Sequence, residues 1–311
     1  MKHLLSIEDL DANQLDELLV TAESFAEVQT RDVKKVPALR GRTVVMAFFE
    51  DSTRTRTSFD LAARRLSADV INFSSGSSAV KKGESLRDTV ETISAMGVDA
   101  IVVRHASSGV PRQLVEWTDA SVINAGDGWH QHPTQALLDC YTIRQHKGSL
   151  EGLRIAMCGD VNHSRVARSN VDAFTKLGAE VVVVAPPTLL PPRMADWPVK
   201  LESDLDSILP DLDIVYSLRI QNERISQALF PSVREFRARY GLTKQRMDRL
   251  RPDAMVMHPG PMNRGVEIDP EVADDPRSHV LNQVAAGVPV RMAVLFAVLG
   301  PGRFNEEGVR A

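Results

Sequence analysis

Short apolar runs, rich in β-branched residues, alternate along this chain with stretches of helical periodicity. Runs such as TVVMAFFE (43–50) and EVVVVAP (180–186) are apolar at consecutive positions, which is typical of strands buried on both faces of a parallel sheet. The segments between the runs carry apolar residues at the spacing of amphipathic helices. Because alternating strands and helices pack as a parallel sheet covered by helices, the sequence predicts an α/β fold.

The alternation continues through both halves of the chain. The first predicted helix, 11–28, begins with Asp11 and Gln14, which can form a capping pair. Further helices are expected at 55–66, 84–96, 111–117, 133–146, 164–177, 205–209 and 284–299. Strands are expected at 43–50, 69–74, 100–105, 121–126, 153–160, 180–186, 213–218 and 254–260.

The length of 311 residues suggests two domains, since a domain usually has about 100–200 residues. The turn-rich segment KGSLEG (147–152) marks the expected boundary region. We therefore expect two doubly wound parallel-sheet domains joined by interdomain helices. The first domain covers 1–147 and the second 148–283, and the apolar C-terminal segment 284–311 is expected to pack back against the first domain.

Composition excludes several classes of protein. Hydrophobic residues make up 43% and charged residues 25%, as in ordinary globular proteins, and the net charge of −4 argues against a general nucleic-acid binder. The two cysteines show no disulfide or metal-type pattern, which fits a reducing compartment. The N-terminus lacks the apolar core of a signal peptide, and no apolar run approaches the roughly 20 residues of a membrane span. We expect a soluble cytoplasmic protein.

The segment DSTRTRTSF (51–59) follows the first predicted strand and leads into a helix. Backbone N–H groups at a helix N-terminus bind oxyanions, and Arg54 can add bidentate phosphate recognition. The segment contains neither a P-loop motif nor the glycine pattern of dinucleotide-binding folds. The alternative is a capped helix whose arginines are merely solvated.

Polar groups also follow the other predicted strands. Arg104 ends one strand, and HPTQ (132–135) follows another. His132 could donate to a carbonyl oxygen and Gln135 could bind an amide. His130 and His132 are two residues apart, but no third metal ligand has suitable spacing, so we expect no metal and no cofactor.

Two arginines follow strands of the second half. Arg165 and Arg219 could clamp a dicarboxylate, although each could equally form a surface ion pair. Lys81 and Lys82 lie in a Ser/Gly-rich loop, where lysines are solvated by default. The loop could also reach a site in this chain or in a neighbouring one.

These motifs together resemble the aspartate carbamoyltransferase family over nearly the whole chain. The motifs are STRTR (52–56), KKGES (81–85), VVRH (102–105), GDGWHQHPTQ (126–135), RIQNER (219–224) and HPGP (258–261). STRTR and HPTQ are shared by all carbamoyltransferases, whereas KKGE, RIQ and HPGP favour aspartate as the amine substrate. An ornithine enzyme would carry a cysteine in the segment 258–261, which has none here.

The resemblance implies a role for each matching residue. Those that would bind carbamoyl phosphate are Ser52, Thr53, Arg54, Thr55, Arg104, His132, Gln135, Pro259, Gly260 and Pro261. Those that would bind aspartate are Ser78, Lys82, Arg165, Arg219 and Gln221. Catalysis would rest on Arg54, Thr55, Lys82, Arg104 and His132, and none of the motifs contains an obvious general base.

The resemblance also implies an activity and partners. The activity is carbamoyl transfer from carbamoyl phosphate to L-aspartate in de novo pyrimidine (UMP) biosynthesis. The implied assembly is a homotrimer with shared active sites, in which Ser78 and Lys82 come from the adjacent subunit. Regulatory chains or a dihydroorotase are further partners that the resemblance allows; nucleic acid and membranes are not expected.

Two alternatives remain at this point. One is an ornithine or other amino-acid carbamoyltransferase, which shares the phosphate motif. The other is a catalytically inactive homologue that acts as a scaffold, which loss of Arg54, Lys82, Arg104 or His132 would favour; all four are present.

Overall fold

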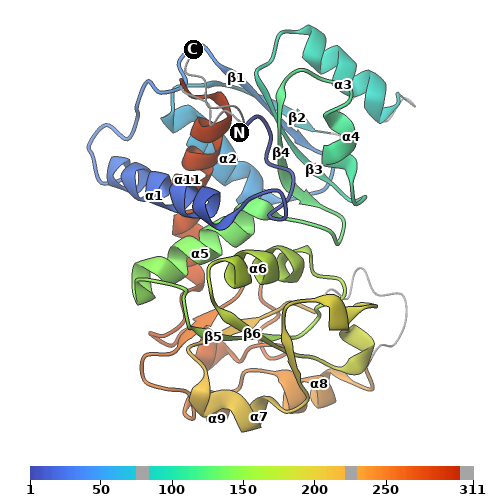
Figure 1. Cartoon of the computed structure of the whole chain (residues 1–311), viewed down its shortest axis with the longest axis vertical. Coiled ribbons are helices and arrows are strands. Elements are labelled where there is room, and N and C mark those ends of the chain that lie inside the picture. The colour runs from blue at the N-terminus through green and yellow to red at the C-terminus, as the bar shows by residue number, and fades with distance from the viewer. Residues whose placement is uncertain (75–83, 221–229, 302–311) are drawn as a thin grey trace. The chain divides into compact units, whose positions relative to one another are not determined.

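The computed structural model describes residues 1–74, 84–220 and 230–301 (Figure 1). The chain divides into two compact units: unit 1 is Met1–Tyr141 with Ala286–Ala311, and unit 2 is Thr142–Ala285. Both divisions fall inside helices, α5 (Pro133–Lys147) and α11 (Val280–Leu299). The predicted α/β fold with interdomain helices is confirmed.

Unit 1 is built on a parallel sheet with the strand order β2-β1-β3-β4. Its strands are β1 (Thr43–Phe48), β2 (Asp69–Ser74), β3 (Ala100–His105) and β4 (Ser121–Asp127). Helices α2 (Thr53–Arg65), α3 (Leu86–Ala95) and α4 (Val110–Leu114) connect them, and α1 (Ala12–Val28) precedes them.

Alternate residues of the unit 1 strands face opposite layers of helices. Val45 and Ile101 pack with Val90 of α3 and Leu114 of α4, which lie on one side of the sheet in Figure 1. The C-terminal part of α11 belongs to unit 1, where Phe296 meets Phe25 of α1 edge-on at 5.7 Å between ring centroids. Burial on both faces explains why these strands read as continuous apolar runs.

Unit 2 contains a second parallel sheet with the order β7-β6-β5-β8-β9. Its strands are β5 (Arg154–Cys158), β6 (Glu180–Val184), β7 (Lys200–Glu202), β8 (Ile214–Ser217) and β9 (Met255–Met257). Its helices are α6 (Arg165–Lys176), α7 (Leu205–Ile208), α8 (Val233–Tyr240), α9 (Lys244–Met247) and α10 (Pro270–Ala273), with short 3-10 turns at Pro187–Leu189, Met194–Asp196 and Leu209–Asp211.

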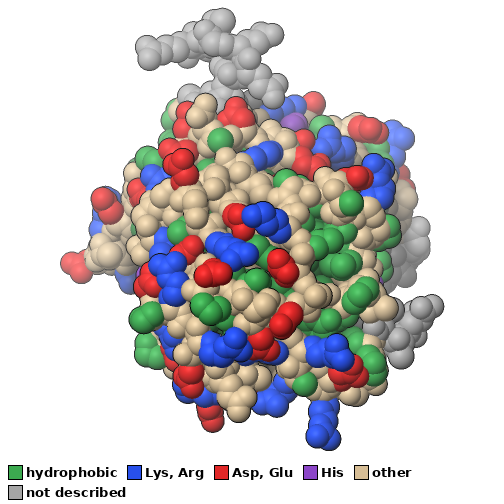
Figure 2. Space-filling model, turned by 60° about the horizontal axis from the view of Figure 1, so that its bottom comes forward, with side chains coloured by type: hydrophobic (Ala, Val, Ile, Leu, Met, Phe, Trp, Pro, Cys, Tyr) green, Lys and Arg blue, Asp and Glu red, His purple; other side chains and the backbone are tan. Residues whose placement is uncertain are grey.

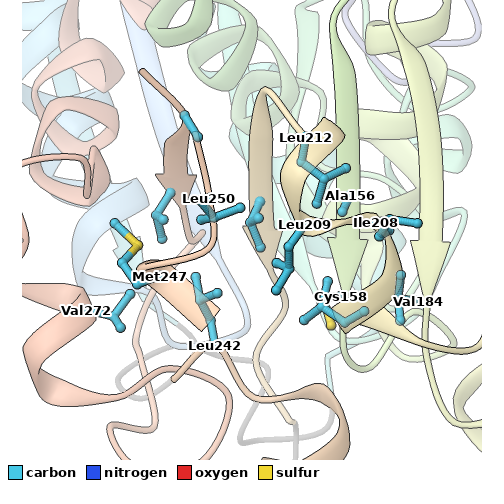
Figure 3. Close-up of a cluster of buried hydrophobic side chains, with 14 of the residues drawn as sticks. Ala156, Cys158, Val184, Ile208, Leu209, Leu212, Leu242, Met247, Leu250 and Val272 are labelled. Atoms are coloured by element: carbon cyan, nitrogen blue, oxygen red, sulfur yellow. The ribbon is translucent and has the colours of Figure 1, made fainter. Parts of the chain in front are cut away.

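One face of the second sheet packs against the short helices of unit 2. Ala156 and Cys158 of β5 contact a cluster that includes Leu209, Met247 and Val272 (Figure 3). Residues from the 3-10 turn that follows α7, from α9 and from α10 thus meet on one sheet face although they are far apart in sequence. Such convergence of side chains is what makes these short helices stable, because isolated helices of this length are not.

Each sheet has a point at which the strand order reverses. In unit 1 the chain moves from β1 outward to β2 and then returns to β3, so the reversal lies between β1 and β3. In unit 2 it lies between β5 and β8. Ligands of open α/β sheets bind beyond the carboxyl ends of the strands at such points. The topology therefore directs attention to the residues that follow β1, β3, β5 and β8.

Several element boundaries differ from the predicted ones. Helix α2 begins at Thr53 rather than at residue 55, and α11 begins at Val280 rather than at 284. The exposed three-residue strand β7 was not predicted, because KLE lacks the apolar run used to recognise strands. The predicted cap of α1 is confirmed: the Asp11 carboxylate accepts the Gln14 N–H at 2.8 Å, and the Gln14 side chain accepts the Asp11 N–H at 2.9 Å.

Charged side chains of both signs are interspersed on the face of the molecule drawn in Figure 2. Several ion pairs of the described residues are exposed, such as Arg87 with Glu91 at 2.7 Å. Exposed pairs of this kind contribute little to stability. Helix α11 is long and apolar enough to cross a membrane by length and composition, but 67% of that window is buried, and core helices pass the same test.

Candidate active site

The predicted phosphate motif forms the first turn of α2. Ser52 is the N-cap residue with extended backbone (φ −161°, ψ 98°), and its hydroxyl does not cap the helix. Thr53, Arg54 and Thr55 are the first three helical residues, whose N–H groups have no partner within an α-helix. Because the helix starts two residues earlier than predicted, the whole motif surrounds the helix N-terminus, where anions bind best.

The two arginines of this motif have different surroundings. Arg56 donates from Nε to Asn72 Oδ1 on β2 at 3.3 Å, and Asn72 Nδ2 donates to Asp60 Oδ1 at 3.0 Å. Arg56 therefore connects α2 to β2. Arg54 is exposed and lies at the second helical position, within the predicted anion site.

Arg104 lies at the reversal of the first sheet. It is aligned with Phe48 of β1, and its carbonyl oxygen accepts the Phe49 N–H at 2.9 Å. Its guanidinium donates to Ala125 O on β4 at 3.3 Å and lies 3.5 Å from Glu50 Oε2. The ends of β1, β3 and β4 thus hold a half-buried cation. It lies on the strand next to β1, whose end leads into the first turn of α2.

The neighbouring His105 does not add a second cation. Burial lowers the pKa of its imidazole. Its Nδ1 accepts the Ser107 N–H at 2.9 Å, and its ring packs against Phe49 with centroids 5.6 Å apart. At neutral pH this histidine is an uncharged support for the strand end.

A buried carboxylate orders the loop between β4 and α5. Asp127 accepts the N–H groups of Gly109 at 2.6 Å and Gln131 at 3.1 Å, and the Asn124 side chain at 2.8 Å. His130 Nδ1 lies 3.1 Å from the same carboxylate, which gives His130 a structural contact. The loop that carries His132 is therefore held from several sides.

A glycine is required in this loop. Gly128 has φ +47°, and a Cβ there would lie 2.4 Å from the Ser108 hydroxyl oxygen and 2.7 Å from its backbone nitrogen. A side chain could not be accommodated without moving backbone.

His132 and Gln135 lie at the start of α5. Both are buried, and the Gln135 N–H donates to His132 O at 2.9 Å. The Gln135 side-chain nitrogen donates to Asp139 Oδ1 at 3.1 Å. Unit 1 therefore brings together, at the carboxyl ends of its strands, a helix N-terminus, an arginine, a histidine and an oriented amide.

The reversal of the second sheet carries the predicted clamp residues. Arg165 is the first residue of α6 and is buried, and the Ser164 hydroxyl accepts the Ala167 N–H at 3.1 Å to cap that helix. Arg219 follows β8 and is half-buried. Gly159 has φ +127°, and a Cβ there would lie 2.6 Å from Leu218 O, so the ends of β5 and β8 approach closely. The topology thus places both arginines at one end of the second sheet.

The HPGP segment is supported by a buried hydrogen-bond chain. His258 Nδ1 accepts the Gly260 N–H at 2.8 Å, so in the neutral ring the proton is on Nε2, which lies 3.1 Å from Glu267 Oε1. Glu267 Oε1 also accepts the Asn263 N–H at 2.6 Å. Asn263 in turn donates from its side chain to Ile220 O at 3.1 Å. The segment is therefore connected to the residue that follows Arg219.

Three predicted site residues, Ser78, Lys82 and Gln221, lie outside the described residues. Pro259 and Gly260 are half-buried, Pro261 is exposed, and the Gly260–Pro261 peptide is cis. Within the described parts of the chain, no group of three or more His, Cys, Asp or Glu side chains could hold a metal ion. Burial raises the pKa of the Cys158 thiol to about 12, so this thiol is not a nucleophile near neutral pH.

Sequence reasoning missed the residues that support the site. Glu50, Asp139 and Glu267 contact Arg104, Gln135 and His258, respectively. Asp139 follows Gln135 by four residues on α5, a spacing that could have indicated the pair. Glu50 and Glu267 stand in loops, where spacing carries no such signal.

The two halves of the chain match models of the same family. Residues 2–145 match the aspartate/ornithine carbamoyltransferase carbamoyl-P binding domain, and residues 151–298 match the Asp/Orn binding domain. The aspartate carbamoyltransferase catalytic subunit of Acidothermus cellulolyticus is 58% identical over 302 residues, which cover 97% of this chain and 94% of that protein.

Solved structures of the family share the fold. Aspartate transcarbamoylase from Trypanosoma cruzi, in complex with carbamoyl phosphate and aspartate, is 30% identical with a TM-score of 0.88, covering 96% of this chain and 97% of that one. Ornithine carbamoyltransferase from Pyrococcus furiosus is also 30% identical, with a TM-score of 0.85 and the same coverage of 96% and 97%. The chain belongs to the aspartate/ornithine carbamoyltransferase family, as its motifs predicted.

Proposed function

We propose that this chain is an aspartate carbamoyltransferase, which converts carbamoyl phosphate and L-aspartate to N-carbamoyl-L-aspartate and phosphate in de novo pyrimidine biosynthesis. The observation that carries the proposal is the position of STRTR, whose residues form the N-cap and first turn of α2 at the reversal of the first sheet. The 58% identity to a catalytic subunit of that name supports aspartate over ornithine as the amine substrate.

The first step of the proposed mechanism is capture of the phosphate. The N–H groups of the first turn of α2, with the hydroxyls of Ser52, Thr53 and Thr55, bind its oxygens. The guanidinium of Arg54 supplies a bidentate contact and compensates negative charge. Because the backbone N–H groups are fixed by the helix, they are oriented for the phosphate before it binds.

Polarisation of the carbonyl group is the second step. Arg104, His132 and the Thr55 hydroxyl donate hydrogen bonds to the carbonyl oxygen, on which negative charge develops during attack. One well-placed donor of this kind typically contributes about 100- to 1,000-fold to the rate. Glu50 and Ala125 O contact the guanidinium of Arg104 and so limit its motion.

The carbamoyl NH2 group is bound by acceptors. These are the side-chain oxygen of Gln135 and the backbone carbonyl oxygens of Pro259 and Gly260. The pair of His258 and Glu267 holds the Gly260 peptide through the Gly260 N–H. Pro261 completes this segment.

Aspartate is bound through its two carboxylates. Arg165 and Arg219 each supply a planar guanidinium, and Gln221, Ser78 and Lys82 supply further donors. The cations compensate the repulsion between two anionic substrates, so that a chain of net charge −4 can bind both. Much of the rate enhancement then comes from holding the amine near the carbamoyl carbon.

The chemical step is an acyl transfer. The neutral amine of aspartate attacks the carbamoyl carbon and a C–N bond forms. The bond from that carbon to the phosphate oxygen then breaks, and phosphate leaves with the electron pair. The departing phosphate accepts the proton that the amine loses, so no protein carboxylate is needed as a base.

We also propose the assembly and location. Residues 1–147 with 284–311 form the carbamoyl phosphate domain, and residues 148–283 form the aspartate domain. The chain acts as a cytoplasmic homotrimer in which Ser78 and Lys82 serve the site of the adjacent subunit. The name "catalytic subunit" of its relatives supports association with other chains, such as regulatory chains or a dihydroorotase.

Carbamoyl phosphate labelled in its carbonyl carbon tests the proposed reaction. The purified chain is incubated with the label and with aspartate or ornithine in parallel. Labelled N-carbamoyl-aspartate is expected from aspartate, and no labelled citrulline from ornithine. Citrulline as the main product would contradict the proposal, as would the absence of transfer to either amine.

A further inference from the structure

Asp139 is a fully buried carboxylate on α5 that has no role in the mechanism proposed above. Its Oδ1 accepts a hydrogen bond from the Gln135 side-chain nitrogen at 3.1 Å, one helical turn earlier. A buried carboxylate requires compensation by a cation or by hydrogen bonds. Gln135 is one hydrogen-bond partner of Asp139, and the charge of Asp139 also acts on a buried cation.

That cation is Arg291 of α11, which is 4% exposed. Its guanidinium carbon lies 5.1 Å from the ring centroid of Phe59 on α2, and Nη1 donates to Gly287 O at 3.1 Å. Burial lowers the pKa of Arg291 to about 9, and the charge of Asp139 opposes this shift. Arg291 is therefore still a cation at neutral pH, buried in the same unit as Asp139, whose charge acts on it.

An ionised carboxylate can only accept hydrogen bonds. The atom of Gln135 that faces Asp139 must then be the nitrogen, although nitrogen and oxygen of an amide are alike in shape. The atom that Gln135 can offer to a ligand is consequently its carbonyl oxygen, a pure acceptor. A carbamoyl group presents an NH2 donor, whereas its close analogue, an acetyl group, presents a methyl group.

We propose that Asp139 is a positioning residue that sets the amide orientation of Gln135, so that the site selects a carbamoyl group over an acetyl group. The inference rests on the proposed carbamoyl transfer, because it concerns the same amide subsite. In this proposal Arg291 is the buried cation that compensates the charge of Asp139. With the amide turned over, two NH2 groups would face each other and the acceptor would be lost.

The test compares two ligands that differ only in this group. Dissociation constants of carbamoyl phosphate and acetyl phosphate are measured by calorimetry on the intact protein without aspartate. In the unaltered protein, carbamoyl phosphate is expected to bind about tenfold more tightly, as one hydrogen bond would predict. In Asp139→Leu the ratio is expected to approach one, while the affinity for inorganic phosphate stays within about twofold.

Further variants separate orientation from folding. Asp139→Leu leaves Arg291 without a counter-charge, so Asp139→Leu/Arg291→Met provides a neutral version of the same test. Asp139→Asn retains an acceptor oxygen for Gln135 and is expected to recover part of the discrimination. Asp99→Asn is the matched control, because Asp99 accepts the Thr43 N–H at 2.8 Å at the opposite ends of the strands.

An unchanged ratio in the double variant overturns the inference. An equal loss of affinity for carbamoyl phosphate and acetyl phosphate also overturns it, because such a loss indicates a structural role only. The inference fails as well if Asp139→Asn loses as much discrimination between the two ligands as the leucine variants. The labelled transfer assay is independent of these measurements. Failure of the proposed function would appear there in the unaltered protein, whereas failure of this inference appears only in the binding ratio.

Discussion

At the scale of single residues, Arg54 and Arg56 show that position in the fold can give two identical side chains different roles. Both belong to STRTR and both are exposed. Arg56 donates to Asn72 on the adjacent strand, whereas Arg54 lies at the second position of α2, in the turn that forms the predicted anion site. The first is a structural contact and the second a ligand contact in the proposed mechanism.

Arg54→Ala is expected to lower kcat by about 100- to 1,000-fold, because it removes a charged contact to the leaving phosphate. The free energy of unfolding should change by no more than about 0.5 kcal/mol, as for other exposed positions. Steady-state kinetics and urea unfolding measure the two effects.

Arg56→Ala is the matched control on the same helix. It should lose about 0.5–1 kcal/mol of stability with its hydrogen bond to Asn72, and its activity should fall less than that of Arg54→Ala. The opposite ranking of the two variants in kcat would contradict the assigned roles.

At the scale of elements, loops are held by buried side chains from distant positions. The hydrogen-bond chain from Glu267 through His258 to Gly260 supports the segment that binds the carbamoyl amide in the proposed mechanism. Glu267→Leu removes the acceptor of a buried N–H, which costs about 1–3 kcal/mol. We expect lower thermal stability together with a raised KM for carbamoyl phosphate.

Glu267→Gln retains an acceptor oxygen, so its thermal stability and its KM for carbamoyl phosphate should change less than those of Glu267→Leu. A loss of stability in Glu267→Leu with unchanged KM would show that the chain supports the fold but not the binding segment.

A second interaction at this scale, a partly buried ion pair, joins two short helices of unit 2. Asp206 of α7 accepts from Arg246 Nη2 of α9 at 2.7 Å, and Arg246 Nη1 donates to Gly241 O at 2.7 Å. Arg246 is buried, so Asp206→Asn leaves its charge poorly compensated. The expected loss is about 1–2 kcal/mol, discounted because Asp206 itself is partly exposed.

The pH dependence of this loss has a defined sign. The hydrogen bond from Arg246 lowers the pKa of Asp206 below its ordinary value of 3.8. The stabilisation is therefore complete above that value and disappears as the pH falls through the lower pKa of the folded protein. Chemical unfolding from pH 3 to 7 should show a constant difference between unaltered protein and Asp206→Asn near neutrality that shrinks in acid. A difference independent of pH would contradict the charge-based explanation.

At the scale of the whole molecule, the proposed trimer makes a quantitative prediction. If Lys82 serves the adjacent subunit, mixtures of Lys82→Ala chains and Arg54→Ala chains contain some sites with both side chains intact. Random assembly in equal amounts gives about a quarter of the normal number of sites. Mixing after denaturation and refolding should restore a matching fraction of activity, although each variant alone is nearly inactive. No recovery in hybrid trimers, identified by mass spectrometry, would contradict the shared site.

The order of strands and helices could be predicted because strands covered on both faces are apolar throughout, as in Val44–Phe48. The motifs that carry the family resemblance were likewise visible as short local strings. The start of α2 could not be placed correctly, because Thr and Ser side chains suit both a cap and a first turn.

What the amino-acid order could establish, then, was the α/β alternation, the division into two halves, the family and the residues of its motifs. These properties are local, because each depends on the spacing of apolar residues or on a short run of contiguous residues. The strand orders, the reversals between β1 and β3 and between β5 and β8, and the electrostatic effect of Asp139 on Arg291 arise only on folding. Asp139 and Arg291 are far apart in sequence, and both charges are shielded from water only once α5 and the end of α11 pack within unit 1, because burial of a charge requires compensation.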